Sequence, residues 1–318
     1  MNTQRTFIRL ARFVVVLSIL GLSLAFFSGA NYPNTARAEA LTFSAPGVTP
    51  ARNPLAPAYT GCGEVASPPR TNTAYEQAVF DLTNEQRAAN GKPPLKRWDG
   101  LDQSAQYHAI DMAVDNYFDH STYDRVGGAL QLICAFSARV RPFYFSAQSM
   151  VGENIVGGWS TPAEAIAAWM VSPGHRANIL SDNFRKMGVG YHYESASDFD
   201  HYWVQNFGQP YDQNNQPIFP LIINQDEVST TSTNVTIYIY GYGDPASEWE
   251  QMRLRNDGGA WGSWKPFQNS FSWTRNNTSG IRTVDAELKW NTDTFIASDS
   301  INYTGASTRQ IYLPLVVR

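Results

Sequence analysis

The sequence predicts an α+β fold in which a domain of helices and strands precedes a small all-β sandwich. Three observations predict it. Two long segments after residue 71 carry apolar residues at helical spacing, and aromatic, β-branched segments typical of strands follow them. After a polar linker the pattern changes to strands alone. A chain of 318 residues is long enough for two such domains.

The N-terminal 40 residues have the pattern of a secretory signal peptide. Arg5, Arg9 and Arg12 precede the apolar run FVVVLSILGLSLAFF, and the small-residue motifs ARA and AEA follow it. We therefore expect a secreted or cell-surface protein. The run is short for a membrane span and no later stretch reaches about 18 apolar residues, so we expect no transmembrane segment after cleavage. Retention of the run as an anchor is the less favoured alternative.

Composition sets the expected boundaries in the rest of the chain. An irregular arm rich in proline and small residues precedes the mixed domain, and a polar linker separates that domain from the sandwich. The segments are 41–70 for the arm, 71–208 for the mixed domain, 209–218 for the linker, 219–304 for the sandwich and 305–318 for a tail. Because both patterns look complete, we expect the two domains to fold independently.

Individual elements of the mixed domain can be read from their patterns. AYEQAVFDLTNEQRAANG and LDQSAQYHAIDMAVDNYF predict amphipathic helices, and STPAEAIAAWM predicts a third helix that starts at its Thr-Pro pair. KMGVGYHYE and HYWVQNFG predict strands around the loop SASDFD. In the second domain NVTIYIYGYG, QMRLRNDGGAW and TVDAELKW predict strands, the second crossing an Asn-Asp-Gly-Gly turn.

Cys62 and Cys134 are the two cysteines of the chain. Export to an oxidising compartment makes a disulfide between them the favoured interpretation. A catalytic thiol is the alternative, but neither cysteine has a histidine close in sequence. The bond would tie the N-terminal arm to the first domain.

The segment VSPGHRANIL predicts a helix start with a histidine in its first turn. Ser172 can supply the N-cap oxygen and Pro173 suits the first helical position. The free amides of that turn oppose positive charge, so we expect His175 to favour its neutral form. A neutral imidazole can accept a hydrogen bond or bind a metal.

Two more ionisable residues lie in similar settings, His120 in YFDHS and Glu153 in VGENIVGG. Each has a structural alternative: a histidine after a helix can interact with the helix C-terminus, and a glutamate between glycines can accept turn amides. His120 should hold its proton more readily than His175 if that helix end acts on it.

Taken together, these segments resemble the CAP superfamily of cysteine-rich secretory proteins, antigen 5 and pathogenesis-related class 1 proteins, most closely its bacterial secreted branch. The resemblance runs from about Thr71 to Gly208 and rests on the motifs LTNEQRAANGKPPLKRW, YFDHS, GENI, AWMVSPGHRANIL, MGVGY and YWVQNFG. It implies a three-layer α-β-α sandwich with a cleft formed by His120, Glu153 and His175. The all-β region resembles bacterial immunoglobulin-like surface modules.

The chain departs from the animal and plant pattern of this family at one point. A second glutamate that follows the tryptophan of AWM in those proteins is absent, and Val171, Ser172 and Pro173 occupy its place. Bacterial relatives look similar in this respect. Asp119 and Asp124 are candidates to replace the missing acid.

Three functions fit these residues. The favoured one is a secreted, non-enzymatic binding protein for a lipid-like or cell-envelope ligand; the alternatives are a structural surface module and a metal-dependent hydrolase. No catalytic residue is assigned and no cofactor is certain. His120, Glu153 and His175 would be the ligands of a divalent metal such as zinc. No GxSxG motif indicates a serine hydrolase. A net charge of −4 provides no basic face for nucleic acid.

Aromatic residues outside the cleft leave two interpretations open. The tryptophans of the second domain would form a carbohydrate-binding platform or, as favoured, mostly fill the core. They are Trp249, Trp261, Trp264, Trp273 and Trp290. Phe143, Tyr144 and Phe145 would either pack under the cleft or form an apolar lip beside it.

Overall fold

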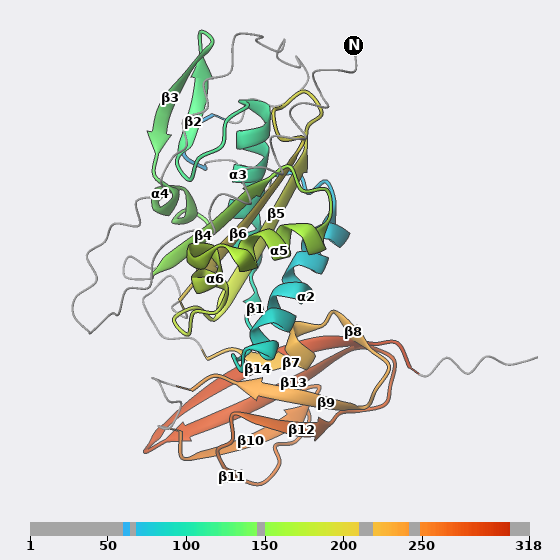
Figure 1. Ribbon diagram of the computed structural model, residues 1–318. Coiled ribbons are helices and arrows are strands. Elements are labelled where there is room, and N and C mark those ends of the chain that lie inside the picture. The colour runs from blue at the N-terminus through green and yellow to red at the C-terminus, as the bar shows by residue number, and fades with distance from the viewer. Residues whose placement is uncertain (1–59, 64–67, 145–149, 210–218, 242–248, 306–318) are drawn as a thin grey trace, which may run out of the picture. The chain divides into compact units, whose positions relative to one another are not determined.

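The computed structural model describes residues 60–63, 68–144, 150–209, 219–241 and 249–305 (Figure 1). The predicted signal peptide, the linker from residue 210 onward, the tail after residue 305 and most of the arm lie outside these residues. Among the described residues no helix is both long enough and apolar enough to cross a membrane.

The first half of the described chain is an α-β-α sandwich built on a four-stranded sheet (Figure 1). The strand order is β1 (Lys96–Arg97), β5 (Lys186–Tyr193), β6 (His201–Gly208) and β4 (Val151–Gly157), with β1 parallel to β5 and the other pairs antiparallel. The helices are α2 (Thr73–Ala89), α3 (Asp99–Val114), α5 (Pro162–Val171) and α6 (Pro173–Ile179). This arrangement confirms the predicted fold class.

Alternation along β6 separates the two helical layers. Trp203 and Phe207 pack in one core cluster with residues of α2 and α5, whereas Tyr202 and Val204 pack in another with residues of α3. Since successive side chains of a strand point to opposite faces, α3 covers one face of the sheet and α2 with α5 covers the other.

The predicted helix boundaries follow from local capping. Asn72 caps α2 by accepting a hydrogen bond from the backbone N–H of Tyr75, and Gly91, just beyond the helix, has a φ of 68° that favours glycine. Thr161 and Glu164 form a capping box at the start of α5, with Pro162 in the first turn. These signals are local, which is why the sequence pattern located both helices.

The amphipathic pattern predicted for α3 is wrong. Nearly all of its residues from Leu101 to Ala113 are buried, because α3 lies between the sheet and further chain segments. Its polar side chains are used inside: Asp102 accepts from the backbone N–H of Val189, and Gln106 accepts from that of Tyr191. A Cβ at Gly188 would lie 2.0 Å from the backbone nitrogen of Asp102, so glycine permits this close approach.

A two-stranded hairpin and a short helix extend the first domain beside α3. The hairpin consists of β2 (Thr122–Val126) and β3 (Ala129–Cys134), and α4 (Phe136–Val140) follows it. Cys62 and Cys134 form a disulfide, as predicted, with their Cα atoms 5.9 Å apart. The arm is thereby attached to the end of β3.

The second half is all β, with two sheets around one core. One sheet has the order β11-β10-β13-β14-β8 and the other β12-β9-β7. The bounds are β7 (Leu221–Ile223), β8 (Ser229–Thr230), β9 (Asn234–Ile239), β10 (Gln251–Asn256), β11 (Lys265–Pro266), β12 (Ser270–Thr274), β13 (Gly280–Trp290), β14 (Asp293–Tyr303) and the 3-10 helix η1 (Asn224–Asp226). The resemblance to immunoglobulin-like modules stays a prediction.

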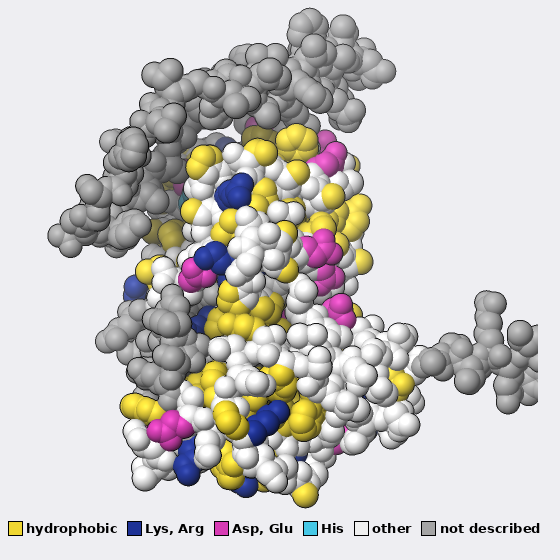
Figure 2. All heavy atoms as spheres, turned by 60° about the horizontal axis from the view of Figure 1, so that its bottom comes forward, with side chains coloured by type: hydrophobic (Ala, Val, Ile, Leu, Met, Phe, Trp, Pro, Cys, Tyr) yellow, Lys and Arg dark blue, Asp and Glu magenta, His cyan; other side chains and the backbone are white. Residues whose placement is uncertain are grey.

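The tryptophans of this half divide between core and surface. Trp249 is buried and Trp273 packs against the core, in agreement with the prediction that these tryptophans mostly fill the core. Trp261 and Trp264 instead lie under the guanidinium groups of Arg253 and Arg255, and Trp290 is exposed. Figure 2 shows dark blue and yellow side chains next to one another on one face of the molecule. Arginines over the rings disfavour an open carbohydrate platform at Trp261 and Trp264.

Tyr144 belongs to the interior, whereas Phe143 is half-buried. Tyr144 is buried and packs with Leu101 and Val140, and the Phe143 ring lies at the position a Cβ on Gly63 would approach. Phe145 lies outside the described residues.

Candidate functional site

Glu153 of β4 is the centre of the predicted cleft. Its carboxylate is 1% exposed, and its Oε1 lies 3.0 Å from Nδ1 of His120. The structure therefore brings together two of the three predicted residues. The side chain of His120 is 32% exposed, so one end of this pair reaches solvent while the other is buried.

Arg139 of α4 provides a buried positive charge for Glu153. Its guanidinium donates to Glu153 Oε2 at 2.5 Å, to Thr122 Oγ1 at 2.7 Å and to the His120 carbonyl at 3.1 Å. In the amide orientation that satisfies both of its ends, Asn206 donates to the same Oε2 at 3.0 Å. Burial alone would raise the pKa of Glu153, but Arg139 and the nearby histidines outweigh it and lower that pKa to about 2. Glu153 is an ionised and fully bonded group.

His108 of α3 is a second buried histidine at this site. Its Nε2 lies 2.9 Å from the carbonyl oxygen of Asp119 and 4.0 Å from Glu153 Oε1. Burial, followed by the charge of Arg139, lowers the pKa of His108 to about 3. The imidazole is therefore neutral, and Nε2 donates to the carbonyl.

His175 lies in the first turn of α6, as predicted, and its backbone connects it to β4. Asn154 donates to the His175 carbonyl at 3.1 Å, and Asn178 donates to the Glu153 carbonyl at 3.2 Å and to Asn154 Oδ1 at 2.9 Å. Burial, with a smaller effect from the charge of His120, lowers the pKa of His175. The predicted neutral bias has the expected direction, with burial as its main cause.

Two local explanations from the sequence need correction. Ser172 occupies the N-cap position of α6, but its side chain makes no capping hydrogen bond. His120 lies beyond the end of α3, which finishes at Val114, and a helix dipole acts mainly within the last turn. The carboxylate of Glu153, not a helix end, is the charged partner of His120.

The two candidate replacements for the missing acid accept hydrogen bonds from backbone amides. Asp119 Oδ1 accepts from the backbone N–H of Ser121 at 2.6 Å, and Asp124 accepts from the backbone N–H of Gly61. Among the described residues, His120, Glu153 and His175 do not form a group whose ligand atoms all lie within 4.8 Å of one another. Three-ligand coordination would require their side chains to move.

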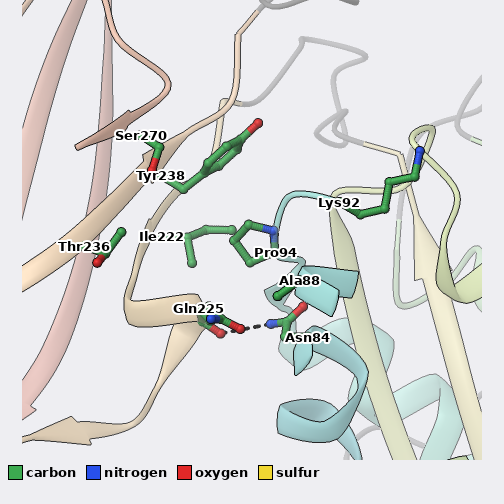
Figure 3. Close-up of a pocket in the computed structure, with 9 residues that line it drawn as sticks. All are labelled: Asn84, Ala88, Lys92, Pro94, Ile222, Gln225, Thr236, Tyr238 and Ser270. Carbon is green, nitrogen blue, oxygen red and sulfur yellow. Dashed lines mark hydrogen bonds between the residues drawn. The ribbon is translucent and has the colours of Figure 1, made fainter. Parts of the chain in front are cut away.

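A separate cavity of about 180 Å³ involves none of these residues. Residues of α2 and of the all-β half line it, and Asn84 donates to the Gln225 carbonyl at its wall (Figure 3). Neighbouring contacts include Lys96 with Asp226 and with Asp299.

Comparison with known proteins identifies the α-β-α part. Residues 80–207 match the model of the cysteine-rich secretory protein family, CAP. This segment is a CAP domain. It contains His108, His120, Arg139, Glu153 and His175, so the whole candidate site lies within it.

Several bacterial proteins are similar to this CAP domain. The uncharacterized protein YkwD of Bacillus subtilis is 39% identical over 141 residues, which cover 44% of this chain and 49% of the relative. The uncharacterized membrane protein YlbC of the same species is 29% identical over 139 residues, 43% of this chain and 35% of the relative. The matches thus span half or less of these relatives. An extracellular SCP-domain protein of Bacillus anthracis has a solved structure with 27% identity, 45% coverage of both chains and a TM-score of 0.37.

Sequence reasoning missed much of the charge network in the CAP domain. Asn154 and Asn178 belonged to the quoted motifs GENI and HRANIL, but their hydrogen bonds became visible only in the folded chain. Arg139 follows the hairpin, and no local pattern indicated that it would face Glu153. The residues three and four positions from His108 are Ser104, Ala105, Asp111 and Met112, so no apolar pattern singled out this histidine.

The buried His108 should make stability depend on pH. Its pKa is lowered from 6.5 to about 3, so below pH 6.5 the unfolded state binds a proton that the folded state excludes. The contribution of neutral His108 to the free energy of unfolding is complete above pH 6.5. It decreases as pH falls towards 3, by about 1.4 kcal/mol per pH unit. When the pH is lowered from 6.5 to 5, we expect the free energy of unfolding of His108→Gln to fall by about 2 kcal/mol less than that of the parent. Urea unfolding at the two pH values measures this difference.

The comparison between variant and parent is necessary because Asp111 acts in the opposite direction. Burial raises its pKa to about 8, so its contribution decreases as pH rises. Burial also lowers the pKa of His192, which lies outside the cleft, so His192→Gln should reduce the pH dependence in the same direction and is the positive control. Equal pH slopes for His108→Gln and the parent would contradict the assignment of His108 as a buried neutral group.

Proposed function

We propose that this protein is an exported, non-enzymatic binding protein whose ligand contacts His120 and His175 of the CAP domain. The observation that carries the proposal is that the Glu153 carboxylate already has its charge and hydrogen-bond partners within the protein. Its carboxylate is buried, paired with Arg139 at 2.5 Å and bonded to His120 at 3.0 Å. Glu153 then orients the site while the two half-exposed imidazoles remain accessible to a ligand.

The same pairing of Glu153 within the protein disfavours the metal-dependent hydrolase. An efficient general base has a pKa near the working pH, whereas that of Glu153 is lowered to about 2. A metal would also have to compete with the Arg139 guanidinium for Oε2. Glu153 therefore fits poorly as a third metal ligand.

A divalent metal fits the two histidines better than it fits all three residues. Because ionised Glu153 accepts from Nδ1 of His120, the neutral ring keeps Nε2 as its acceptor. A carboxylate behind a histidine commonly orients it as a metal ligand. His120 and His175 would hold a zinc ion, which would supply a Lewis-acidic contact for an anionic ligand group.

Apolar side chains near His120 support a lipid-like or cell-envelope ligand. Phe136 lies edge-on to the His120 ring, with ring centres 6.5 Å apart. Leu132 is 63% exposed and Ile133 38% exposed on β3, just before Cys134. Since Cys134 pairs with Thr122, these side chains lie near the strand that begins two residues after His120. A polar group at the imidazoles with an apolar part along the hairpin matches this surface.

Native mass spectrometry of the mature protein from its own host tests the proposal. We expect a retained lipid-sized mass that falls at least tenfold in occupancy in a His120→Ala/His175→Ala variant, because the polar contacts are lost. His192→Ala, a histidine of β5 outside the cleft, should retain the mass.

Other outcomes separate the alternatives. A stoichiometric zinc mass together with hydrolytic activity would support the metal-dependent hydrolase and contradict the proposal. Bare protein from the native host, with both histidines intact, would support a structural surface module instead.

A further inference from the structure

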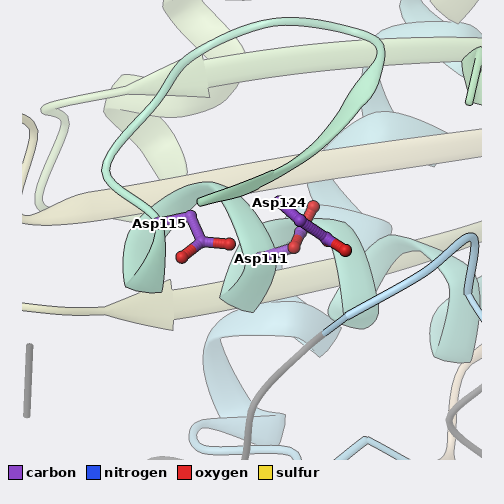
Figure 4. Close-up of side chains that lie close together, drawn as sticks. All are labelled: Asp111, Asp115 and Asp124. Carbon is purple, nitrogen blue, oxygen red and sulfur yellow. The ribbon is translucent and has the colours of Figure 1, made fainter. Parts of the chain in front are cut away.

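A second group of titratable side chains lies away from the histidine cleft. Asp111 and Asp115 are four residues apart at the C-terminal end of α3, and Asp124 faces them from β2 (Figure 4). One carboxylate oxygen from each lies within 4.8 Å of the other two. Asp111 and Asp115 are buried and Asp124 is half-buried.

This placement is electrostatically unfavourable for the protein alone. Negative charges at a helix C-terminus oppose the helix dipole, and like charges four residues apart repel each other. Burial, together with Asp115 and Asp124, raises the pKa of Asp111 against the opposing effects of Tyr117 and Arg139. Within the described part of the chain, no salt bridge includes Asp111 or Asp124.

An orphaned buried atom provides an independent indication of a ligand. Asp111 is 0% exposed, and its Oδ2 accepts a hydrogen bond from the Tyr117 hydroxyl. Its Oδ1 is also buried and has no hydrogen-bond partner in the structure. Leaving a buried acceptor without a partner costs free energy. A cation or a hydrogen-bond donor bound at this oxygen would remove that cost.

The remaining contacts hold the other two carboxylates in place. Asp124 accepts from the backbone N–H of Gly61 at 3.1 and 3.3 Å, and Gly61 precedes the disulfide-bonded Cys62. Asp115 Oδ2 accepts from the backbone N–H of Arg125 at 3.3 Å. Arm, helix and hairpin therefore meet at the cluster, and the disulfide constrains the arm there.

We propose that Asp111, Asp115 and Asp124 bind one calcium ion. Three carboxylates are hard oxygen donors, which suit calcium, magnesium or manganese rather than zinc. Calcium is favoured among these because it accepts irregular oxygen sets, whereas magnesium demands near-ideal octahedral geometry. Calcium would neutralise the repulsion and give Asp111 Oδ1 its partner.

The calcium site is distinct from the proposed ligand cleft. It uses carboxylates of α3 and β2, whereas the cleft uses imidazoles of His120 and His175. Its role would be structural, joining the arm and the hairpin to α3. The calcium proposal therefore does not depend on whether the cleft binds a ligand.

Isothermal titration of the metal-free mature protein with calcium chloride tests the proposal. We expect one site with a dissociation constant of about 0.1–1 mM, as in extracellular calcium modules, and a rise of a few degrees in the unfolding midpoint at 10 mM calcium (about ten times that constant or more). Asp124→Asn keeps the acceptor for Gly61 but removes the charge, so binding should weaken at least tenfold. Asp115→Asn should do the same.

Asp81→Asn, an exposed aspartate of α2, is the matched control and should bind like the parent. A His120→Ala/His175→Ala variant should also bind calcium normally, which separates this site from the cleft. Unchanged affinity in both Asp124→Asn and Asp115→Asn, or no heat and no midpoint shift with calcium in the parent, would overturn the proposal. Stronger binding of magnesium than of calcium would overturn the choice of ion.

Discussion

Replacing Arg139 with methionine is expected to lower the free energy of unfolding by about 3–5 kcal/mol, because it leaves the Glu153 carboxylate buried without its countercharge. Arg139 and Glu153 are 0% and 1% exposed at their side chains, so water cannot replace the lost partner. Two further acceptors, the His120 carbonyl and Thr122 Oγ1, lose their donor as well. Urea unfolding at neutral pH measures the change.

A double-mutant cycle separates the pair from its surroundings. Adding Glu153→Gln to Arg139→Met removes the unpaired charge, so the double variant should recover part of the loss. Lys92→Met breaks an ion pair of the same 2.5 Å length with Asp182, but both partners are substantially exposed. It should cost less than about 1 kcal/mol. A loss below that value for Arg139→Met would mean that the buried pair is not a major source of stability.

Removal of the disulfide by Cys62→Ser/Cys134→Ser is expected to destabilise the protein by about 4 kcal/mol. The bond joins residues 72 positions apart, and the chain-entropy model assigns roughly that value to a loop of this length. The structure adds a local reason, since Gly61 donates to Asp124 and accepts from the Tyr107 hydroxyl only while the arm is held against α3. Urea unfolding of the double variant and the parent measures the difference.

Thiol labelling provides the control for this prediction. The denatured, unreduced parent should contain no free thiol, and the reduced parent should unfold at the urea concentration of the double-serine variant. Two labelled thiols before reduction would refute the disulfide. Equal stability of parent and variant would show that the arm contributes nothing through it.

Periodicity and capping made the main elements of the CAP domain predictable. α2 and α5 begin at side chains that satisfy their own first amides, Asn72 and Thr161, and β5 and β6 follow their apolar patterns. The burial of α3 was not predictable in the same way, because it depends on the arm and the hairpin that pack around the helix. Its polar residues look solvent-facing until the backbone amides of β5 are placed beside them.

The sequence by itself determined the fold class, the CAP resemblance and the cysteine pair, and it named His120, Glu153 and His175 as candidates, because motifs and local signals lie within short stretches of chain. Only the tertiary structure decided how those residues are used. Arg139 reaches Glu153 across 14 positions, His108 across 45, and Asp124 joins Asp111 and Asp115 from another element. Charge pairing and desolvation depend on distances in space, so they set the protonation and pairing of both clusters of side chains only once the chain has folded.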